Sequence, residues 1–380
     1  MIHNKVKILF LIDELTIGGT EKQLMLLADS LPTSRFEPVI GVLRETDFSR
    51  GLRLSTPIVN FNWAGLPLIK NIDLIGKIKR YIDANNIDIL QTQFNESEVY
   101  GTLAAKITSV KPIVIATRRN LYQWLKDDPL GFHAGKLLLR WSRAVISNSY
   151  SAQAACLRLE NVPKEKIIVI PNAVAVEKFN TLSCREARDQ CGLNPDDVII
   201  GVVGNWREVK GIDIFLQAAA KVRNAIPAAK FMLVGSGPQE AELRALAENL
   251  GITDNVVFWG PTDNAPLVMA AFDIAVQPSR SESFSNVLVE YMAAAKPIVA
   301  TNVGDAEFIL DGGSCGRLVE PGSPEELADA IVALHQNKDT AMAMAMKGRQ
   351  RVEENWSTVS IIEQYVTLYE NLVGSSPLSG

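Results

Sequence analysis

The chain has 380 residues, of which 47% are hydrophobic, 7% aromatic and 21% charged, and its formal net charge is −5. This composition is that of folded globular proteins and excludes a disordered or fibrous chain, while the length suits two domains rather than one. The acidic balance argues against a nucleic-acid-binding protein, which would normally be basic.

Short apolar runs alternate with amphipathic stretches along the first half of the chain. The first run, residues 6–12, is too short for the core of a signal peptide and is followed at once by Asp13 and Glu14, so we expect a buried strand. Similar runs, expected as parallel strands covered on both faces, lie at residues 37–43, 57–61, 88–93, 112–117, 144–149 and 166–173. No apolar stretch approaches the roughly 20 residues that span a bilayer, so any membrane contact would be peripheral.

Gly18 and Gly19 follow the first predicted strand and precede an amphipathic helix. Paired glycines at such a turn let backbone N–H groups approach an anion or a sugar closely. A tight turn without a ligand is the alternative. The pattern is not the G-x-G-x-x-G of dinucleotide-binding proteins, and no suitably spaced acidic residue follows it, which disfavours an NAD-dependent dehydrogenase.

A second series of apolar runs begins after residues 171–197, where the apolar periodicity weakens and Pro171 and Pro195 interrupt the chain. The runs of this series lie at residues 197–205, 230–237, 255–260, 273–279, 296–301 and 316–322. The last strong helical pattern, residues 358–373, follows them. The sequence therefore predicts an α/β protein with two open parallel sheets and with ligand-binding residues just after the strands.

Two loops of the second series carry chemistry at such positions. Arg207 and Lys210 flank the turn into a helix that begins near Gly211, so two cations could meet a phosphate beside a positive helix end. Gly235 follows the next strand, and Pro238 is expected at the first position of a helix. Taken one at a time, solvated surface charge and turn geometry explain these loops equally well.

The stretch SESFSNVLVE joins a strand to a helix whose N-cap is Ser285 or Asn286. We expect Glu282 on the loop above the strand ends and Glu290 about one turn into the helix. Free N–H groups from Phe284 to Val287 would point into the same space. An anion seat with two carboxylates beside it matches the diphosphate, sugar and ribose diol of a nucleotide sugar, although exposed charge is the alternative for each glutamate.

With these residues in view, the chain resembles a retaining glycosyltransferase of the GT-B fold, family 4. The resemblance covers nearly the whole chain, and PSRSESFSNVLVEYMAAAKPIVAT is its most specific part. It implies two Rossmann-like domains that face each other across a cleft. Residues 1–172 would form the acceptor-side domain and residues 173–357 the donor-binding domain, with helix 358–373 crossing back to the first.

The resemblance also implies roles for matching residues. Glu290 would hold the ribose hydroxyls and Glu282 the donor sugar, and Arg207 and Lys210 would hold the diphosphate. Further donor contacts would come from Gly18, Gly19, Gly204, Gly235, Phe284, Ser285, Asn286 and Val287. Such enzymes are usually metal-independent, in agreement with the absence of a D-x-D motif, so we expect neither a metal nor a cofactor.

Two departures from the family pattern affect these roles. Members commonly have Gly-Arg where this chain has Gly204-Asn205, which moves the expected cation to Arg207. Many place a histidine where this chain has ATRRN, and the chain has only three histidines. We therefore predict that the leaving phosphate takes the acceptor proton itself and that Arg119 acts in catalysis by steering the acceptor or donor.

The segment RRNLYQWLKDDPLGFHAGKLLLRWSR combines basic residues with aromatic and aliphatic ones, among them Trp124, Phe132 and Trp141. One reading is a surface that binds an anionic or lipid-linked acceptor at a membrane, with Arg118, Asn120 and Trp124 as acceptor contacts. The other reading is a core-facing amphipathic helix preceded by a solvated loop.

The predicted function is transfer of a hexosyl group from a nucleotide diphosphate sugar to a glycan or lipid-linked acceptor in bacterial polysaccharide biosynthesis, with UDP-glucose or UDP-GlcNAc as the preferred donor. A nucleotide-sugar epimerase or a non-catalytic sugar-nucleotide-binding protein of the same fold is the alternative. The four cysteines form no C-x-x-C motif and are interpreted as reduced thiols. We expect the protein in the cytoplasm, with or without peripheral contact at the inner face of the membrane.

Overall fold

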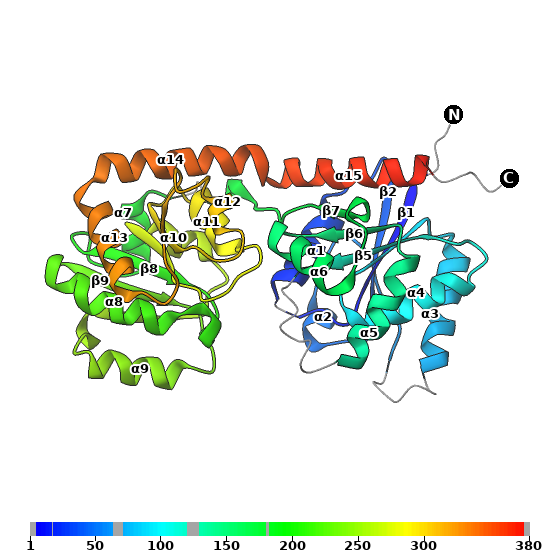
Figure 1. The fold of residues 1–380 in the computed structure, drawn as a ribbon, viewed down its shortest axis with the longest axis horizontal. Coiled ribbons are helices and arrows are strands. Elements are labelled where there is room, and N and C mark those ends of the chain that lie inside the picture. Colours follow the sequence, from blue (N-terminus) through cyan, green and yellow to red (C-terminus); the bar gives the residue numbers. More distant parts are fainter. Residues whose placement is uncertain (1–4, 17, 64–70, 120–128, 180–181, 376–380) are drawn as a thin grey trace. The chain divides into compact units, whose positions relative to one another are not determined.

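The computed structural model describes residues 5–16, 18–63, 71–119, 129–179 and 182–375. The chain divides into two compact units: a first unit of residues 1–172 with 361–380, and a second unit of residues 173–360. Both consist of a parallel sheet with helices packed around it (Figure 1).

Within the described residues, the first unit contains a seven-stranded sheet in the order β3-β2-β1-β4-β5-β6-β7. Its strands are β1 (Val6–Ile12), β2 (Phe36–Val42), β3 (Ile58–Asn60), β4 (Ile89–Thr92), β5 (Ile113–Arg118), β6 (Ala144–Ser147) and β7 (Ile167–Val169). Residues 8–12 of β1 are fully buried, as expected for a central parallel strand covered on both faces.

The helices of the first unit are α1 (Gly19–Ser30), α2 (Asp47–Gly51), α3 (Asn71–Asn85), α4 (Asn95–Ile107), α5 (Pro129–Leu138), η3 (Leu139–Trp141), α6 (Tyr150–Glu160), η4 (Lys164–Lys166) and most of α15 (Thr358–Gly374). The hydroxyl of Tyr369 in α15 donates to the side-chain oxygen of Gln91 at 2.7 Å, and its ring contacts Phe36 edge-on with centroids 6.0 Å apart. The C-terminal helix is therefore part of the first unit's core.

The second unit contains a six-stranded sheet, counted over the same described ranges, in the order β10-β9-β8-β11-β12-β13. Its strands are β8 (Val198–Val203), β9 (Ala229–Val234), β10 (Val256–Gly260), β11 (Ile274–Gln277), β12 (Ile298–Thr301) and β13 (Arg317–Val319). Its helices are η5 (Val176–Phe179), α7 (Cys184–Gln190), η6 (Glu208–Lys210), α8 (Ile212–Ala225), α9 (Glu240–Asn249), η7 (Thr253–Asn255), α10 (Ala265–Ala270), α11 (Asn286–Ala293), α12 (Ala306–Ile309), α13 (Pro324–Gln336) and α14 (Lys338–Asn355).

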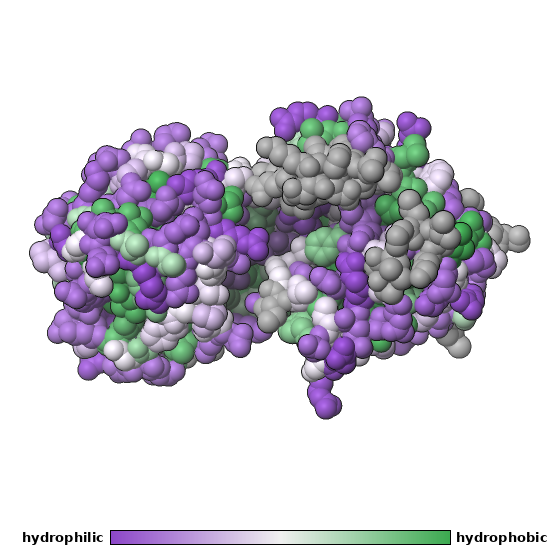
Figure 2. Space-filling view, turned by 90° about the horizontal axis from the view of Figure 1, so that it is seen from below, coloured by the Kyte–Doolittle hydropathy of each residue, from purple (hydrophilic) through white to green (hydrophobic). Residues whose placement is uncertain are grey.

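Every apolar run predicted as a strand contains one, and all the strand pairs are parallel, which confirms the α/β prediction. The surface of the second unit, at the left of Figure 2, is mostly hydrophilic on the face shown, with smaller hydrophobic areas. No described helix is long and apolar enough to cross a membrane. None of the four cysteines, all of which are described, forms a disulfide.

Candidate active site

The second sheet changes the direction of its strand order between β8 and β11. These strands are neighbours, yet the chain runs outward from them in opposite directions, to β9 and β10 on one side and to β12 and β13 on the other. In open α/β sheets, ligands bind outside the carboxyl ends of the strands at such a point. The predicted donor residues of the second unit come from the loops that follow β8, β9 and β11.

Tyr291 of α11 bridges the carboxyl ends of β8 and β11. Its hydroxyl accepts a hydrogen bond from the N–H of Val203 at 2.7 Å and donates one to the carbonyl of Val276 at 3.3 Å. Burial raises the pKa of this tyrosine above its ordinary value, so the hydroxyl keeps the proton that it donates. Sequence reasoning missed Tyr291 because an aromatic residue within a helix signals only a core position.

The helix after β8 begins against the loop that follows β11. Gly211, the N-cap of α8, has a φ of 65°, in the left-handed region that glycine adopts without strain. A Cβ at this position would lie 2.0 Å from the carbonyl oxygen of Pro278. A larger residue would therefore push the two loops apart, and glycine keeps η6 beside the β11 loop.

Lys210 and Glu282, both predicted from sequence, form an ion pair in this structure. The Lys210 Nζ lies 2.6 Å from Glu282 Oε1, and the Ser279 hydroxyl donates to the same oxygen at 2.8 Å. Both Lys210 and Glu282 retain partial exposure, so the pair remains accessible to a ligand. Arg207, three residues earlier, is exposed.

A second ion pair fixes the same loop to α8. Arg280 donates to both carboxylate oxygens of Asp213, at 2.7 and 2.6 Å, and to the carbonyl of Glu208 at 2.8 Å. Burial alone would raise the pKa of Asp213, but the hydrogen bond and charge of Arg280 outweigh it, and the pKa is lowered. Sequence reasoning missed this pair; its only signal was an acidic residue in the first turn of α8.

The predicted anion-binding site lies at the start of α11. Ser285 occupies the N-cap position, but its side chain accepts no bond from the helix and instead accepts one from the Gln277 amide at 2.9 Å. Phe284 is buried, with its ring centroid 6.1 Å from that of Trp356. The first turn of α11 contains no acidic residue, so no carboxylate from that turn offsets the positive end of the helix.

Glu290 shares a face of α11 with Asn286 and Val287, because it follows them by four and three positions. All three keep partial exposure, whereas Leu288 and Val289 are buried. Glu290 therefore lies in the second turn of the helix, on a solvent-accessible face, next to the residues that begin it.

The glycines after β8 and β9 allow two loops to pack closely. Gly235 has a φ of 133°, and a Cβ there would lie 1.9 Å from the carbonyl oxygen of Gly204. The prediction that Pro238 opens the next helix is wrong, since α9 begins at Glu240. The residues before α9 form a turn held to the β8 loop, because the N–H of Gln239 donates to the carbonyl of Trp206 at 3.2 Å.

In the first unit, the Gly18-Gly19 turn begins α1, with Gly18 at the N-cap. The space beside Gly18 is filled by the carboxylate of Glu21, whose Oε2 lies 2.1 Å from where a Cβ of residue 18 would be. Glu21 is buried and accepts a hydrogen bond from the Thr16 hydroxyl at 2.7 Å. An internal carboxylate thus occupies part of the predicted anion seat at this turn.

Arg118, a predicted acceptor contact, lies in a buried cluster of charges. Its guanidinium bonds Glu98 at 2.7 Å and Glu160 at 2.8 Å, and both carboxylates are nearly inaccessible. Burial raises the pKa of Glu98, and the charge of Arg118 opposes that rise. The structure accounts for Arg118 as an internal ion-pair residue that ties β5 to α4 and α6.

Arg119 connects β5 to the end of the unit. Its Nη1 donates to the Asn172 side-chain oxygen at 2.8 Å. It also lies beside Tyr365 of α15. Burial raises the pKa of Tyr365 above its ordinary value, and Arg119 opposes that rise. The Arg119 Nε is buried and has no hydrogen-bond acceptor within the described part of the chain. The other predicted acceptor contacts, Asn120 and Trp124, lie outside the described residues.

The carboxyl end of β1 holds a residue that sequence reasoning did not select. Asp13 accepts a hydrogen bond from the N–H of Ser97 in the first turn of α4, at 2.7 Å. Burial is the main cause that raises its pKa from 3.8 to about 6, and Glu96 raises it further. The available signal was an acidic residue directly after a buried strand at the point where the first sheet changes direction.

Two family profiles match the chain. A profile described as Glycosyltransferase Family 4 matches residues 17–178, and one described as Glycosyl transferases group 1 matches residues 197–337. Among curated proteins, the N-acetyl-alpha-D-glucosaminyl L-malate synthase of Bacillus anthracis is 29% identical over 305 residues, covering 80% of each chain. The D-inositol 3-phosphate glycosyltransferase of Segniliparus rotundus is 34% identical over 190 residues, covering 48% of this chain and 42% of its own.

Solved structures share the fold. HepE (Alr3699) of Anabaena, crystallised in complex with UDP, superposes with a TM-score of 0.85 at 23% identity, over 96% of this chain and all of its own. Crystal structures of the same protein hold UDP with glucose, and UDP-glucose. The profiles, relatives and fold agree, and this chain belongs to the group 1, family 4 glycosyltransferases of the GT-B fold.

Proposed function

We propose that this glycosyltransferase moves a hexosyl group, with retention of anomeric configuration, from a UDP-sugar to a glycan or lipid-linked acceptor. The observation that carries the proposal is the meeting of the loops that follow β8 and β11. They bring the Lys210 ammonium, the Glu282 carboxylate and the uncapped start of α11 together.

The diphosphate of the donor would bind at the start of α11 beside Lys210 and Arg207. After its bond to Glu282, the Lys210 ammonium retains two N–H donors. Negative charge grows on the leaving diphosphate as the glycosidic bond breaks, and cations and N–H dipoles already in position stabilise that charge without reorganising. Each such contact is worth about 3 kcal/mol in the transition state.

The carboxylates of Glu282 and Glu290 would accept hydrogen bonds from the hydroxyl groups of the donor. Glu282 is held in position by Lys210 and Ser279, so its second oxygen can accept a sugar hydroxyl with little loss of side-chain entropy. Glu290, on the accessible face of α11, would accept the paired ribose hydroxyls. Backbone groups of Gly204, Gly235 and the residues that begin α11 would complete the donor contacts.

UDP-glucose and UDP-GlcNAc are the proposed donors. The HepE complexes with UDP and UDP-glucose support the uridine diphosphate and the glucose, and the name of the Bacillus anthracis relative supports an N-acetylglucosaminyl group. Within the described residues, no group of three or more His, Cys, Asp or Glu side chains forms a metal-binding cluster. We propose metal-independent transfer, in which the leaving phosphate accepts the acceptor proton.

The acceptor would be recognised by the first unit. Arg119 is the proposed steering residue, because its Nε faces no acceptor atom within the described residues and its guanidinium is fixed by Asn172. Arg118 is fully engaged with Glu98 and Glu160, which leaves it a positioning role behind Arg119.

A peripheral contact with the inner face of the membrane is also proposed. Leu137 and Trp141 are 56% and 45% exposed, and Lys106 lies over the Trp141 ring at 4.8 Å from its centroid. Such pairing of apolar and basic side chains suits the interface of an anionic bilayer. Leu138 and Leu139 of the same segment are buried, so the stretch also packs into the core.

The deciding experiment is a thermal-shift panel of UDP, GDP, ADP and their sugars, followed by turnover assays with the donor that stabilises the protein. UDP and its sugars should raise the melting temperature most, because a ligand that binds only the folded state stabilises it. Donor consumption that requires an acceptor supports transfer. Formation of an isomeric nucleotide sugar without acceptor would support an epimerase, and binding without turnover would support a non-catalytic binding protein.

A further inference from the structure

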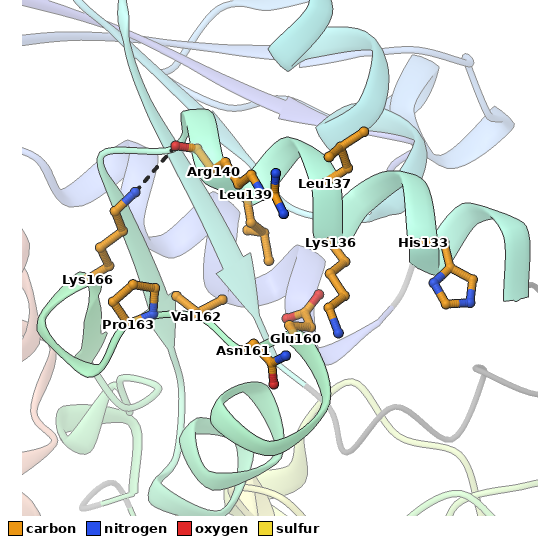
Figure 3. A pocket seen from close by; sticks show the side chains of 10 residues that line it. All are labelled: His133, Lys136, Leu137, Leu139, Arg140, Glu160, Asn161, Val162, Pro163 and Lys166. Atoms are coloured by element: carbon orange, nitrogen blue, oxygen red, sulfur yellow. Dashed lines mark hydrogen bonds between the residues drawn. The ribbon is translucent and has the colours of Figure 1, made fainter.

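A cavity of about 510 Å³ lies in the first unit, and none of its lining residues is a predicted donor contact. One side consists of α5 and η3, and the other of the end of α6 and the turn that precedes β7 (Figure 3). These segments come immediately before β6 and β7. One lining residue, Glu160, accepts hydrogen bonds from Arg118 of β5, so the cavity adjoins the buried charge cluster next to Arg119.

Basic side chains line this cavity. Lys136 donates to the carbonyl of Leu159 at 2.9 Å, and Lys166 donates to the carbonyl of Ser142 at 3.1 Å. These bonds fix both ammonium groups and leave each with N–H donors for a ligand. Arg140 also lines the cavity and is exposed.

The acidic residue in the cavity wall does not neutralise these cations. Glu160 accepts two hydrogen bonds from Arg118, from Nε at 2.8 Å and Nη2 at 2.9 Å, and it is the one acidic side chain among the lining residues, against Lys136, Arg140 and Lys166. The net charge of the whole chain is −5, yet residues 133–166 contain six Lys and Arg against two Glu. The cavity therefore has a positive potential on a protein that is acidic overall.

Apart from His133 and Asn161, the remaining lining is apolar. Leu139, Val162 and Pro163 contribute hydrophobic surface, and Leu139 and Val162 are buried. A cavity with cations at its rim and hydrophobic walls matches a ligand that combines a charged phosphate with a non-polar part. Arginine suits this role because its planar fork of N–H donors matches phosphate oxygens.

We propose that the cavity is a second ligand site that binds the phosphate group of an amphiphilic phosphate ester. Arg140, Lys136 and Lys166 bind the phosphate oxygens, and Leu139, Val162 and Pro163 contact the apolar part. The site is independent of the donor, because it lies in the other unit and uses none of the residues assigned to the diphosphate. The ester is either a soluble molecule or the headgroup of an anionic phospholipid.

The test uses the full chain and measures binding of two probes. The probes are inorganic phosphate, by calorimetry, and phosphatidylcholine vesicles with and without phosphatidylglycerol, by co-sedimentation. Arg140→Glu should weaken binding of a phosphate-bearing probe at least about tenfold, as expected for loss of one charge-assisted contact. Arg143→Glu is the matched control, since Arg143 is exposed and near Arg140 but does not line the cavity. Lys210→Ala identifies phosphate bound in the second unit.

Weaker phosphate binding in Arg140→Glu with unchanged vesicle binding assigns the cavity to a soluble phosphate ester. Weaker binding to vesicles that contain phosphatidylglycerol, with or without weaker phosphate binding, assigns it to a lipid headgroup. The proposal is overturned if Arg140→Glu binds both probes as wild type does, or if Arg143→Glu loses as much. It is also overturned if neither probe binds wild type, or if only Lys210→Ala loses phosphate.

Discussion

In the first sheet, α1 and α4 have carboxylates of this chain at their amino termini, whereas the first turn of α11 in the second sheet contains no acidic residue. Glu21 fills the space beside Gly18 at the start of α1, and Asp13 accepts the Ser97 N–H in the first turn of α4. At the start of α11, the Ser285 side chain accepts no bond from the helix, and the first turn contains no acidic residue.

The comparison teaches how two sheets with the same kind of direction change can have different ligand preferences. A carboxylate at a helix amino terminus satisfies free N–H groups and offsets their positive charge, so an external anion gains little there. A helix start with no side-chain cap bond from Ser285, and with Lys210 paired to Glu282 in the preceding loop, offers a positive helix end and a cation to the ligand. The donor phosphates are therefore expected on the second unit.

The largest expected effect comes from removing the cation beside α11. Lys210→Ala should lower kcat with a UDP-sugar about 100- to 1,000-fold, because one preorganised contact to the leaving diphosphate is lost. Steady-state kinetics measure the change. Lys221→Ala is the control, since Lys221 lies on α8 but pairs with the exposed Glu325 and should leave kcat unchanged. A Lys210→Ala variant with the kcat of wild type would contradict the proposal that Lys210 stabilises the leaving diphosphate.

The close contact between the β8 and β11 loops can be broken at Gly211. Gly211→Ala should lower the free energy of unfolding by about 3–4 kcal/mol, because the new Cβ meets the Pro278 carbonyl and the residue keeps a positive φ. Gly192→Ala shares the positive φ but meets no atom within 4 Å, so it should cost only about 1–2 kcal/mol. Urea denaturation compares them, and equal losses would show that the contact is unimportant.

The carboxylate at α4 predicts a pH dependence in the first unit. Burial raises the pKa of Asp13 from 3.8 to about 6, so the folded state binds this proton more tightly than the unfolded chain does. The contribution of Asp13 to stability is then lost as the pH rises from about 4 to about 6, by at most about 3 kcal/mol. Asp13→Asn keeps an oxygen for the Ser97 N–H and should be more stable than wild type at about pH 7.

Urea denaturation across this pH range provides the measurement for Asp13→Asn. The stability difference between variant and wild type should shrink towards zero at about pH 4, where Asp13 is protonated in the folded state. A difference that stays constant with pH would contradict the assignment to this carboxyl group.

The smallest expected effect comes from removing the carboxylate charge at the amino terminus of α1. Glu21→Gln should lower the free energy of unfolding by about 1 kcal/mol, because the helix loses the charge that offsets its amino terminus. Glu165→Gln, an exposed change in the same unit, should stay within about 0.5 kcal/mol of wild type. If the two variants are equally stable, the carboxylate at α1 does not offset the helix charge.

The strands were predictable from sequence because a parallel strand buried on both faces must be apolar along its whole length, as residues 8–12 are. The proximity of Lys210 and Glu282 was predictable, because both residues follow strands that end at one edge of a sheet. Local preference failed at Pro238, where the bond from Gln239 to Trp206 delays the helix. The role of Arg118 was not predictable, because its partners Glu98 and Glu160 are distant in sequence. The role of Glu21 was not predictable, because it depends on the side chain turning back towards Gly18.

The phenol of Tyr291 spans the gap between two strands and belongs to the same helix whose first turn is the proposed phosphate seat. Because its hydroxyl bonds both strands, Tyr291 fixes the position of α11 relative to the ends of β8 and β11. A ligand that binds there would meet strand ends and a helix that are already fixed, so little of its binding free energy would be spent on ordering them.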